Sequence, residues 1–258
     1  VVLGMLWIVL RFPAWAAADP AAGFSKKWTR VTDTVFCGAR PETAADFKRV
    51  SDAGCVTVVS VDALPPDESL AQQFGLRRVH IPVGYAGASS NALSMLQLLA
   101  RQTNEPIFVH CHHGQHRGPA MAVMLAMVRG QLTHPEAIEV LHQCGTSLAM
   151  TRLWDQVSSF VPGQVDGSID LMSESPVTPF VSAMTMLDAA AQESPSISLA
   201  QRRVLLEEGY REAIRFAPKN EGLKSELRAG LREIQQSRSL STQAVRQRCV
   251  SCHASFRH

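Results

Sequence analysis

The stretch that decides the fold is residues 106–128, PIFVHCHHGQHRGPAMAVMLAMV. It opens with a short apolar and β-branched run, residues 106–110, which is typical of a buried strand. A polar loop follows, and the uncharged segment 119–128 then predicts a helix that is buried on all sides. Cys111 ends the strand, and Arg117 stands just before the helix. The stretch therefore predicts a strand–loop–helix unit with a cysteine and an arginine at the two ends of the loop.

This loop has the layout of a phosphate-binding cradle. Successive backbone N–H groups of residues 112–117 can point toward an anion, and the N-terminus of helix 119–128 adds partial positive charge. The same field favours the thiolate of Cys111, which can attack phosphorus and form a phosphocysteine that water hydrolyses. Arg117 can hold two oxygens of the transition state, and Gly114 permits the turn. We expect five loop residues to bind the substrate phosphate: His112, His113, Gly114, Gln115 and His116.

The loop, read as HCxxGxxRG, resembles the HCx5R signature of protein tyrosine and dual-specificity phosphatases. The segments VTDTVFCGARP, VVSVDALPP and HIPVGYAG are similar to a bacterial branch of the dual-specificity group. The resemblance covers about residues 29–160 and implies an α/β phosphatase-like domain at 24–162, with Cys111 as nucleophile and Arg117 as phosphate clamp. The alternative is a buried cysteine on an ordinary strand-to-helix turn, which does not explain Arg117 and Gly114 together.

Two positions depart from that family. It has Ser or Thr directly after the arginine, where this chain has Gly118. Its general acid is an Asp on the loop after the preceding strand, but residues 81–88 contain no carboxylate. Asp62, at the C-terminal end of the expected strand 55–61, is the best substitute, because such strand ends face the site in parallel sheets. Asp67 is the second choice, and a turn or capping role for Asp62 is the alternative.

The loop histidines, together with His110, also permit a metal site. The cradle geometry argues against it, because backbone N–H groups rather than side chains then face the ligand. In their cationic forms, these histidines would raise the anion affinity of the loop at lower pH.

Strands and helices alternate over residues 29–162, which predicts a central, mostly parallel sheet flanked by helices. The expected strands are 31–36, 55–61, 76–83 and 106–110, and the expected helices are 41–53, 69–74, 91–102, 119–128 and 135–143. Residues 163–178, GQVDGSIDLMSESPVT, read as a linker. Four amphipathic helices then predict a small all-α bundle, over about 179–192, 198–216, 220–236 and 241–256.

The last of these helices carries Cys249-Val250-Ser251-Cys252-His253, a C-x-x-C-H haem-attachment motif. Two thiols can add to the haem vinyl groups, and the adjacent imidazole can reach the iron. A zinc site is the weaker alternative because the chain has no second C-x-x-C. A thioredoxin-like site would follow a strand, whereas this motif lies at the end of an expected helix.

The position of this motif on the last helix of a bundle resembles cytochromes of the c-prime kind. The resemblance implies a c-type cytochrome domain at 179–258, with one covalent haem c bound through Cys249 and Cys252 and with His253 as the proximal iron ligand. It also implies a sixth iron site that is often open to NO or CO. Met184 and Met186 on the first helix are alternative distal ligands, although core filling is their commoner role.

Composition and the first residues bear on location and partners. Hydrophobic residues make up 46% of the chain, charged residues 19%, and the net charge is +2, so nothing points to nucleic acid. Residues 1–18, an apolar run followed by small residues, predict a signal peptide. We therefore expect periplasmic export, no membrane association after cleavage, and a periplasmic redox partner.

These features support two main hypotheses. The first is a periplasmic cysteine-dependent phosphatase, acting on an unidentified phosphorylated substrate and fused to a c-type haem domain. The second is a haem-based redox, gas-sensing or electron-transfer protein whose phosphatase-like domain only binds an anion or a partner. A sulfur-transferase use of Cys111 is a third, weaker hypothesis.

Overall fold

The computed structural model describes most of the chain between residues 27 and 256. The described residues are 27–163, 165, 178–192, 198–237, 239 and 241–256. The expected signal peptide lies outside them, as does nearly all of the expected linker 163–178.

A five-stranded sheet forms the centre of the α/β region, which we define as residues 27–160. Its strands are β1 (Trp28–Arg30), β2 (Val35–Ala39), β3 (Thr57–Ser60), β4 (Arg77–His80) and β5 (Ile107–Cys111). They lie in the order β1-β2-β5-β3-β4, and only the edge strand β1 pairs antiparallel. The mostly parallel sheet expected from the sequence is confirmed, and β5 lies at its centre.

One expected strand, 31–36, is wrong in its bounds. A turn in which the N–H of Val31 donates to the carbonyl of Val35 over 2.9 Å separates β1 from β2. The polar residues between them favour this turn over a continuous strand. The result is a hairpin that adds the antiparallel edge.

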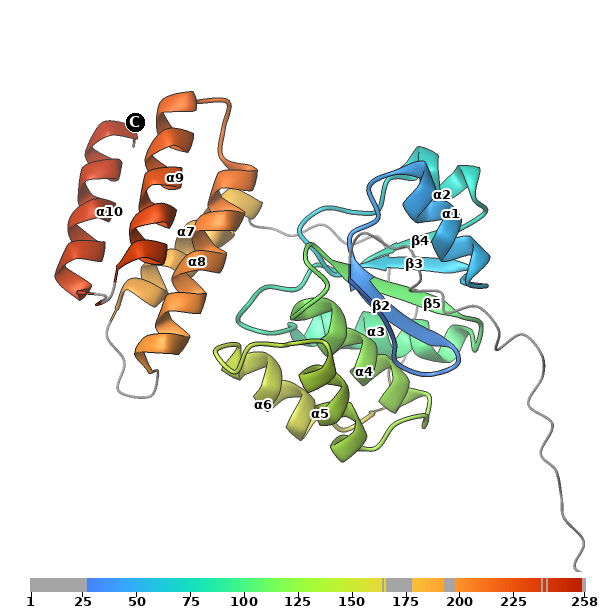
Figure 1. The fold of residues 1–258 in the computed structure, drawn as a ribbon. Helices are drawn as coiled ribbons and strands as arrows, with labels where there is room; N and C mark the ends of the chain where they lie inside the picture. Colours follow the sequence, from blue (N-terminus) through green and yellow to red (C-terminus); the bar gives the residue numbers. More distant parts are fainter. Residues whose placement is uncertain are drawn as a thin grey trace, which may run out of the picture.

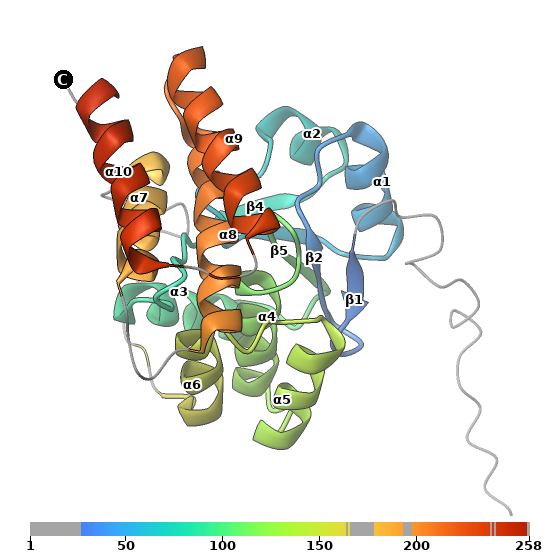
Figure 2. The same ribbon diagram turned by 60° about the vertical axis from the view of Figure 1, so that its left-hand side comes forward.

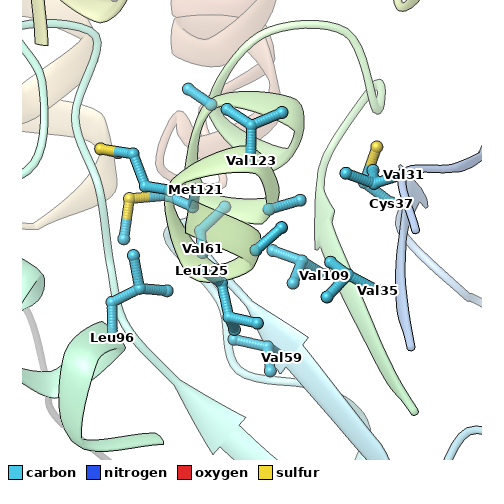
Figure 3. Close-up of a cluster of buried hydrophobic side chains, with 14 of the residues drawn as sticks. Val31, Val35, Cys37, Val59, Val61, Leu96, Val109, Met121, Val123 and Leu125 are labelled. Carbon is cyan, nitrogen blue, oxygen red and sulfur yellow. The ribbon is translucent and has the colours of Figure 1, made fainter. Parts of the chain in front are cut away.

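Helices cover both faces of the sheet (Figure 1). One face is covered by α1 (Ala44–Asp52) and α2 (Glu68–Gln73), and the other by α3 (Ser90–Gln102), α4 (Arg117–Val128), α5 (His134–Gln143) and α6 (Thr151–Ser159). Side chains alternate along β5, so that Phe108 packs toward α1 and α2 whereas Val109 packs against α4. Figure 3 shows Val109 beside Val35, with Leu125 of α4 in the same buried cluster. Because α4 is buried on all sides, it fixes the position of the loop that precedes it.

The sequence analysis missed α6, placing the last helix of this region at 135–143. Leu153 and Val157, one turn apart, are the buried residues of α6, and Trp154 donates its indole N–H to the carbonyl of Ser147 over 2.9 Å. The spacing of these apolar residues was the available signal.

Four helices make up the helical region, which we define as residues 178–256. They are α7 (Pro179–Ala191), α8 (Leu199–Phe216), α9 (Glu221–Gln236) and α10 (Thr242–Phe256), within about one residue of their expected bounds. A shared apolar cluster joins them, and it includes Leu187, Leu206, Leu227, Ile234 and Val245. None of the described helices is long and apolar enough to cross a membrane.

Two of these helices face the α/β region. In Figures 1 and 2, α8 lies beside it, and α9 and α10 lie farther away. Arg215 near the end of α8 donates to a carboxylate oxygen of Asp62 over 2.7 Å, and residues of α7 line a pocket together with Arg117. The helical region therefore covers the carboxyl edge of the sheet, where β5 ends at Cys111.

Candidate active site

The loop between β5 and α4 has a backbone that only glycine permits at its centre. Gly114 has a φ of +67°. A Cβ atom there would lie 2.3 Å from the backbone nitrogen of Ala39 and from the carbonyl carbon of Gly38. The loop is therefore pressed against the end of β2, and a side chain at position 114 would displace it.

The peptide groups of this loop are free to bind an anion. Within the part of the chain that the structure describes, the backbone N–H groups of residues 112–116 donate to no protein acceptor. The Nε of Arg117 is buried and likewise has no hydrogen-bond partner among the described residues. Buried donors without partners cost free energy unless a ligand satisfies them. This cradle surrounds the end of β5, where Cys111 is 3% exposed.

Arg117 is held by groups from two neighbouring loops. Its guanidinium donates to the hydroxyl of Tyr85 over 3.2 Å and to the carbonyl of Val83 over 3.4 Å, and it lies 4.3 Å from the centroid of the Tyr85 ring. An oxygen of Asp62 lies 3.3 Å from Nη2 of Arg117. These contacts fix the direction of the arginine fork.

Asp62, the expected general acid, lies at the site but in an ionised state. Its carboxylate faces Arg117, Arg215 at 2.7 Å and Arg40 at 3.8 Å, and it is fully buried. Burial alone would raise the pKa of Asp62, but Arg117 and Arg215 outweigh burial and hold that pKa well below its usual range. A carboxylate in this state holds no proton at neutral pH, so the geometry favours a positioning role over the proton-donating role expected from the sequence.

The neutral form of the loop histidines is favoured near neutral pH. Burial lowers the pKa of His112 and of His116 to about 4, and it also lowers the pKa of His113. The expectation that their cationic forms raise the anion affinity of the loop at lower pH stays a prediction. Within the described ranges, no three His, Cys, Asp or Glu side chains are grouped so as to hold a metal ion.

Position 118 lies against the expected nucleophile. A Cβ atom at Gly118 would lie 3.1 Å from the backbone nitrogen of Cys111 and 3.4 Å from its sulfur. A hydroxyl-bearing residue at this place would reach the sulfur, and Gly118 supplies none. Gln115 contributes through its backbone, since its carbonyl accepts from the hydroxyl of Thr146 over 2.6 Å.

The six cysteines of the chain are all free thiols in this structure. Two buried ones, Cys37 and Cys144, lie with their sulfur atoms 3.8 Å apart. Cys55 packs on the α1–α2 side of the sheet, away from the loop, and burial raises its pKa to about 12.

The second expected site lies on α10. Cys249 and Cys252 are partly exposed, and His253 is exposed. A cavity of about 480 Å³ opens beside Cys252 and His253, with mainly apolar walls from α7, α9 and α10. Cys249 lines a smaller pocket that Cys252 and His253 also line. Two thiols and an imidazole beside a mainly apolar cavity of ligand size fit a covalently held haem.

The structure distinguishes the two candidate distal methionines. Met184 lines both of the pockets beside the C-x-x-C-H motif. Met186 instead lines a pocket with Arg117 and Tyr85, next to the phosphate-binding loop. Of the two, Met184 is therefore the one that lies beside the C-x-x-C-H motif.

Several residues of the site were missed by the sequence analysis: Arg40, Tyr85, Glu208, Glu212 and Arg215. Three of them come from α8, about 100 residues after Cys111. Tyr85 lies in the segment that carried the family resemblance, which was the available signal. Nothing in the local sequence of α8 distinguishes its charged residues from an ordinary solvent-exposed helix face.

Together, the sheet, the loop and its flanking helices define an α/β protein whose loop between β5 and α4 offers hydrogen-bond donors to an anion. No protein-family model matches the chain, and no curated protein matches it.

Similar folds occur among solved structures of phosphatases. The crystal structure of TpbA from P. aeruginosa is 21% identical and covers 56% of this chain and 89% of its own, with a TM-score of 0.44. A putative phosphatase (DUF442) from Shewanella putrefaciens is 17% identical and covers 52% of this chain and 87% of its own, with a TM-score of 0.43. The core catalytic domain of the PP-IP phosphatase SIW14 from S. cerevisiae is 13% identical and covers 52% and 85%, with a TM-score of 0.43.

Proposed function

We propose that the α/β region is a cysteine-dependent phosphatase with Cys111 as its nucleophile. The observation that carries this proposal is the set of backbone N–H groups at residues 112–116 that donate to no acceptor among the described residues, in the loop that directly follows Cys111, together with the unpartnered Nε of Arg117. Such a set of donors matches the oxygens of a phosphate dianion and favours the thiolate beside it. The substrate is a phosphorylated molecule whose identity the site does not specify.

Each residue then has a definite role. The thiolate of Cys111 attacks phosphorus and forms a phosphocysteine, which water hydrolyses. Arg117 holds two phosphate oxygens as charge develops on them. Asp62 and Tyr85 keep the arginine fork in position through the contacts at 3.3 and 3.2 Å.

The experiment is hydrolysis of an aryl phosphate by the wild-type protein and by Cys111→Ser. We expect the variant to lose activity down to background, a loss on the order of 10⁶-fold, as for other removed nucleophiles. Cys55→Ser removes a buried thiol outside the loop and is the matched control. Activity that survives in Cys111→Ser contradicts the proposal, and persulfide formation on Cys111 without hydrolysis would favour sulfur transfer instead.

We further propose that the helical region is a small bundle that holds one haem c. Cys249 and Cys252 attach it, His253 is its proximal ligand, and Met184 lies on the wall that faces the motif. A bound haem supplies one-electron redox chemistry, and gas binding where a coordination site is open. A pyridine haemochrome spectrum of protein made in a host with haem-attachment machinery tests this. A covalent c-type spectrum that disappears in a Cys249→Ala, Cys252→Ala double variant is expected, and its absence from the wild type contradicts the proposal.

Two features of the anion site are consistent with a second function. Gly118 provides no hydroxyl, and residues of α7 and α8 line the pocket beside Arg117. A haem-based redox, gas-sensing or electron-transfer protein with a non-catalytic α/β region is consistent with both features. Binding of inorganic phosphate without turnover of any aryl phosphate would favour this function.

The proposed location is the periplasm, after removal of the signal peptide expected at residues 1–18. Covalent haem attachment outside the cytoplasm agrees with that location, and a periplasmic redox partner is the corresponding proposal. Detection of the mature protein in a periplasmic fraction, with its N-terminus determined by mass spectrometry, tests the location directly.

A further inference from the structure

Helix α8 places a carboxyl group beside the arginine of the phosphate-binding loop. Oε1 of Glu212 lies 3.7 Å from Nη2 of Arg117, and the residue is 5% exposed. Glu212 and Arg117 line the same pocket of about 70 Å³, together with Tyr85 and residues of α7. A group bound on Arg117 therefore lies against Glu212.

The surroundings of Glu212 make its proton harder to remove than that of an exposed glutamate. Its Oε1 has no hydrogen-bond partner among the described residues, although Arg215 lies 3.6 Å away in addition to Arg117. Burial raises the pKa of Glu212, and Asp62 and Glu208 raise it further, although Arg117 and Arg215 oppose this effect. A phosphate dianion on Arg117 would disfavour a second negative charge still more. Glu212 is thus a buried carboxyl group that can carry a proton toward the site.

We propose that Glu212 is the general acid of the phosphatase reaction, supplied by the helical region. This inference rests on the phosphatase function proposed above. It accounts for the missing carboxylate in residues 81–88 and for the ionised state of Asp62, which is committed to three arginines. The active site is then composite: the nucleophile and the clamp come from the α/β region, and the acid comes from α8.

Glu212 passes its proton to the leaving group and regains one from water. The thiolate of Cys111 forms the S–P bond while the P–O bond to the leaving group breaks. The electron pair of that bond stays on the leaving oxygen, which takes the proton from Glu212. In the second step water attacks phosphorus, the carboxylate of Glu212 takes a proton from that water, and the P–S bond breaks. Inorganic phosphate and the Cys111 thiolate are released, and Glu212 is protonated again.

The test compares leaving groups in Glu212→Gln. We compare kcat/KM, which reports the first step only, because hydrolysis of the phosphocysteine is common to both substrates. With an aryl phosphate whose phenol is acidic, the leaving group needs no proton, so we expect kcat/KM within about threefold of the wild type. With an alkyl phosphate the leaving group needs the proton, and we expect kcat/KM to fall by roughly 10²- to 10⁴-fold. Glu207 lies on the same helix and pairs with Arg211 at 2.8 Å. Glu207→Gln is therefore the matched control. Glu212→Asp keeps the carboxyl group and should recover part of the alkyl phosphate activity.

The pH profile gives an independent readout that a purely structural role would not move. In the wild type, kcat for the alkyl phosphate should fall as pH rises through the pKa of Glu212, because the proton donor is lost. This fall in kcat with rising pH should disappear in Glu212→Gln and remain in Glu207→Gln. The groups facing Glu212 are Arg117, Arg215, Asp62 and Glu208, and all of them are retained in both variants.

Three outcomes overturn the inference, and each is distinct. Equal losses on both substrates in Glu212→Gln mean that the residue only supports the structure. Faster hydrolysis, or tighter binding of inorganic phosphate, means that Glu212 is a carboxylate that blocks the site. An unchanged rate on the alkyl phosphate means that the acid lies elsewhere. If the wild type hydrolyses neither substrate, the proposed phosphatase function fails as well, and this separates the two failures.

Discussion

The two candidate sites of this chain are built in opposite ways. Around Cys111, the arginine clamp and its carboxylate partner are nearly fully buried, and ion pairs tie them to three separate segments of the chain. Around Cys249, Cys252 and His253, the side chains are partly or fully exposed beside a large cavity. Helix α10, which carries them, buries a single residue of its own, Val245.

This difference matches the ligands proposed for the two sites. An anion site can be made from the protein's own N–H groups and charges, which are fixed by the fold before the ligand arrives. A haem site needs a large apolar space that the protein alone does not fill, so the helix that carries the site gains further contacts when the cofactor is bound. We therefore expect the α/β site to depend on its own ion network and α10 to depend on its ligand.

The largest expected effect is on the stability of the α/β region, when the buried negative charge of Asp62 is removed. Asp62→Asn leaves Arg117, Arg215 and Arg40 without their shared anion, and we expect the free energy of unfolding to fall by about 3–5 kcal/mol. Tryptophan fluorescence during guanidinium unfolding measures this in the α/β region, because residues 178–256 contain no tryptophan.

A matched change in the helical region should do little. Glu226 pairs with Arg248 at 3.8 Å, and its side chain is 49% exposed, so Glu226→Gln should change stability by less than about 0.5 kcal/mol. Circular dichroism follows that region. If Asp62→Asn and Glu226→Gln lower the free energy of unfolding by similar amounts, the buried ion network does not contribute more than the exposed pair, and the prediction is contradicted.

The second effect is a pH dependence confined to the α/β region. Burial lowers the pKa of His116 to about 4 and that of His110 to about 3, whereas an unfolded histidine has a pKa of about 6.5. The stability that these neutral histidines contribute is complete above pH 6.5 and is lost as pH falls toward 4. Between pH 7 and pH 5, His116 alone should lower the free energy of unfolding by about 2 kcal/mol.

Fluorescence-detected unfolding at several pH values measures this slope. His116→Asn should reduce it, and His253→Asn, which changes an exposed residue of α10, should leave it unchanged. If the slope of the free energy of unfolding against pH depends on His253 instead, the pH response lies in the helical region, and this contradicts the prediction.

The smallest effect tests the dependence of α10 on its ligand. Attachment of haem should slow amide hydrogen exchange over α10 by about tenfold, equivalent to ~1.4 kcal/mol of added protection. Exchange in residues 112–118 should stay within about twofold. The double variant Cys249→Ala, Cys252→Ala, expressed in the same host, provides the comparison without attached haem. Equal slowing in both segments would show that the two sites respond together.

Much of the architecture follows from local sequence. The alternation of apolar strands with capped helices predicted the mostly parallel sheet, and the bounds of the four later helices lie close to their expected values. The exceptions are α6 and the β1–β2 hairpin. In both places short apolar segments lie between polar turns, and packing against the rest of the core decides whether they become helix or strand.

The sequence by itself determined the strand–loop–helix unit, because Cys111, Gly114 and Arg117 act through the backbone within a few residues of one another. It also placed Cys249, Cys252 and His253 on one helical turn. Only the tertiary structure decided which charges meet at the site. Asp62 and Arg215 are 153 residues apart in the chain, and Glu212 reaches Arg117 only because α8 lies across the carboxyl edge of the sheet. Contacts of this kind depend on how two separately patterned regions pack, and no local periodicity records them.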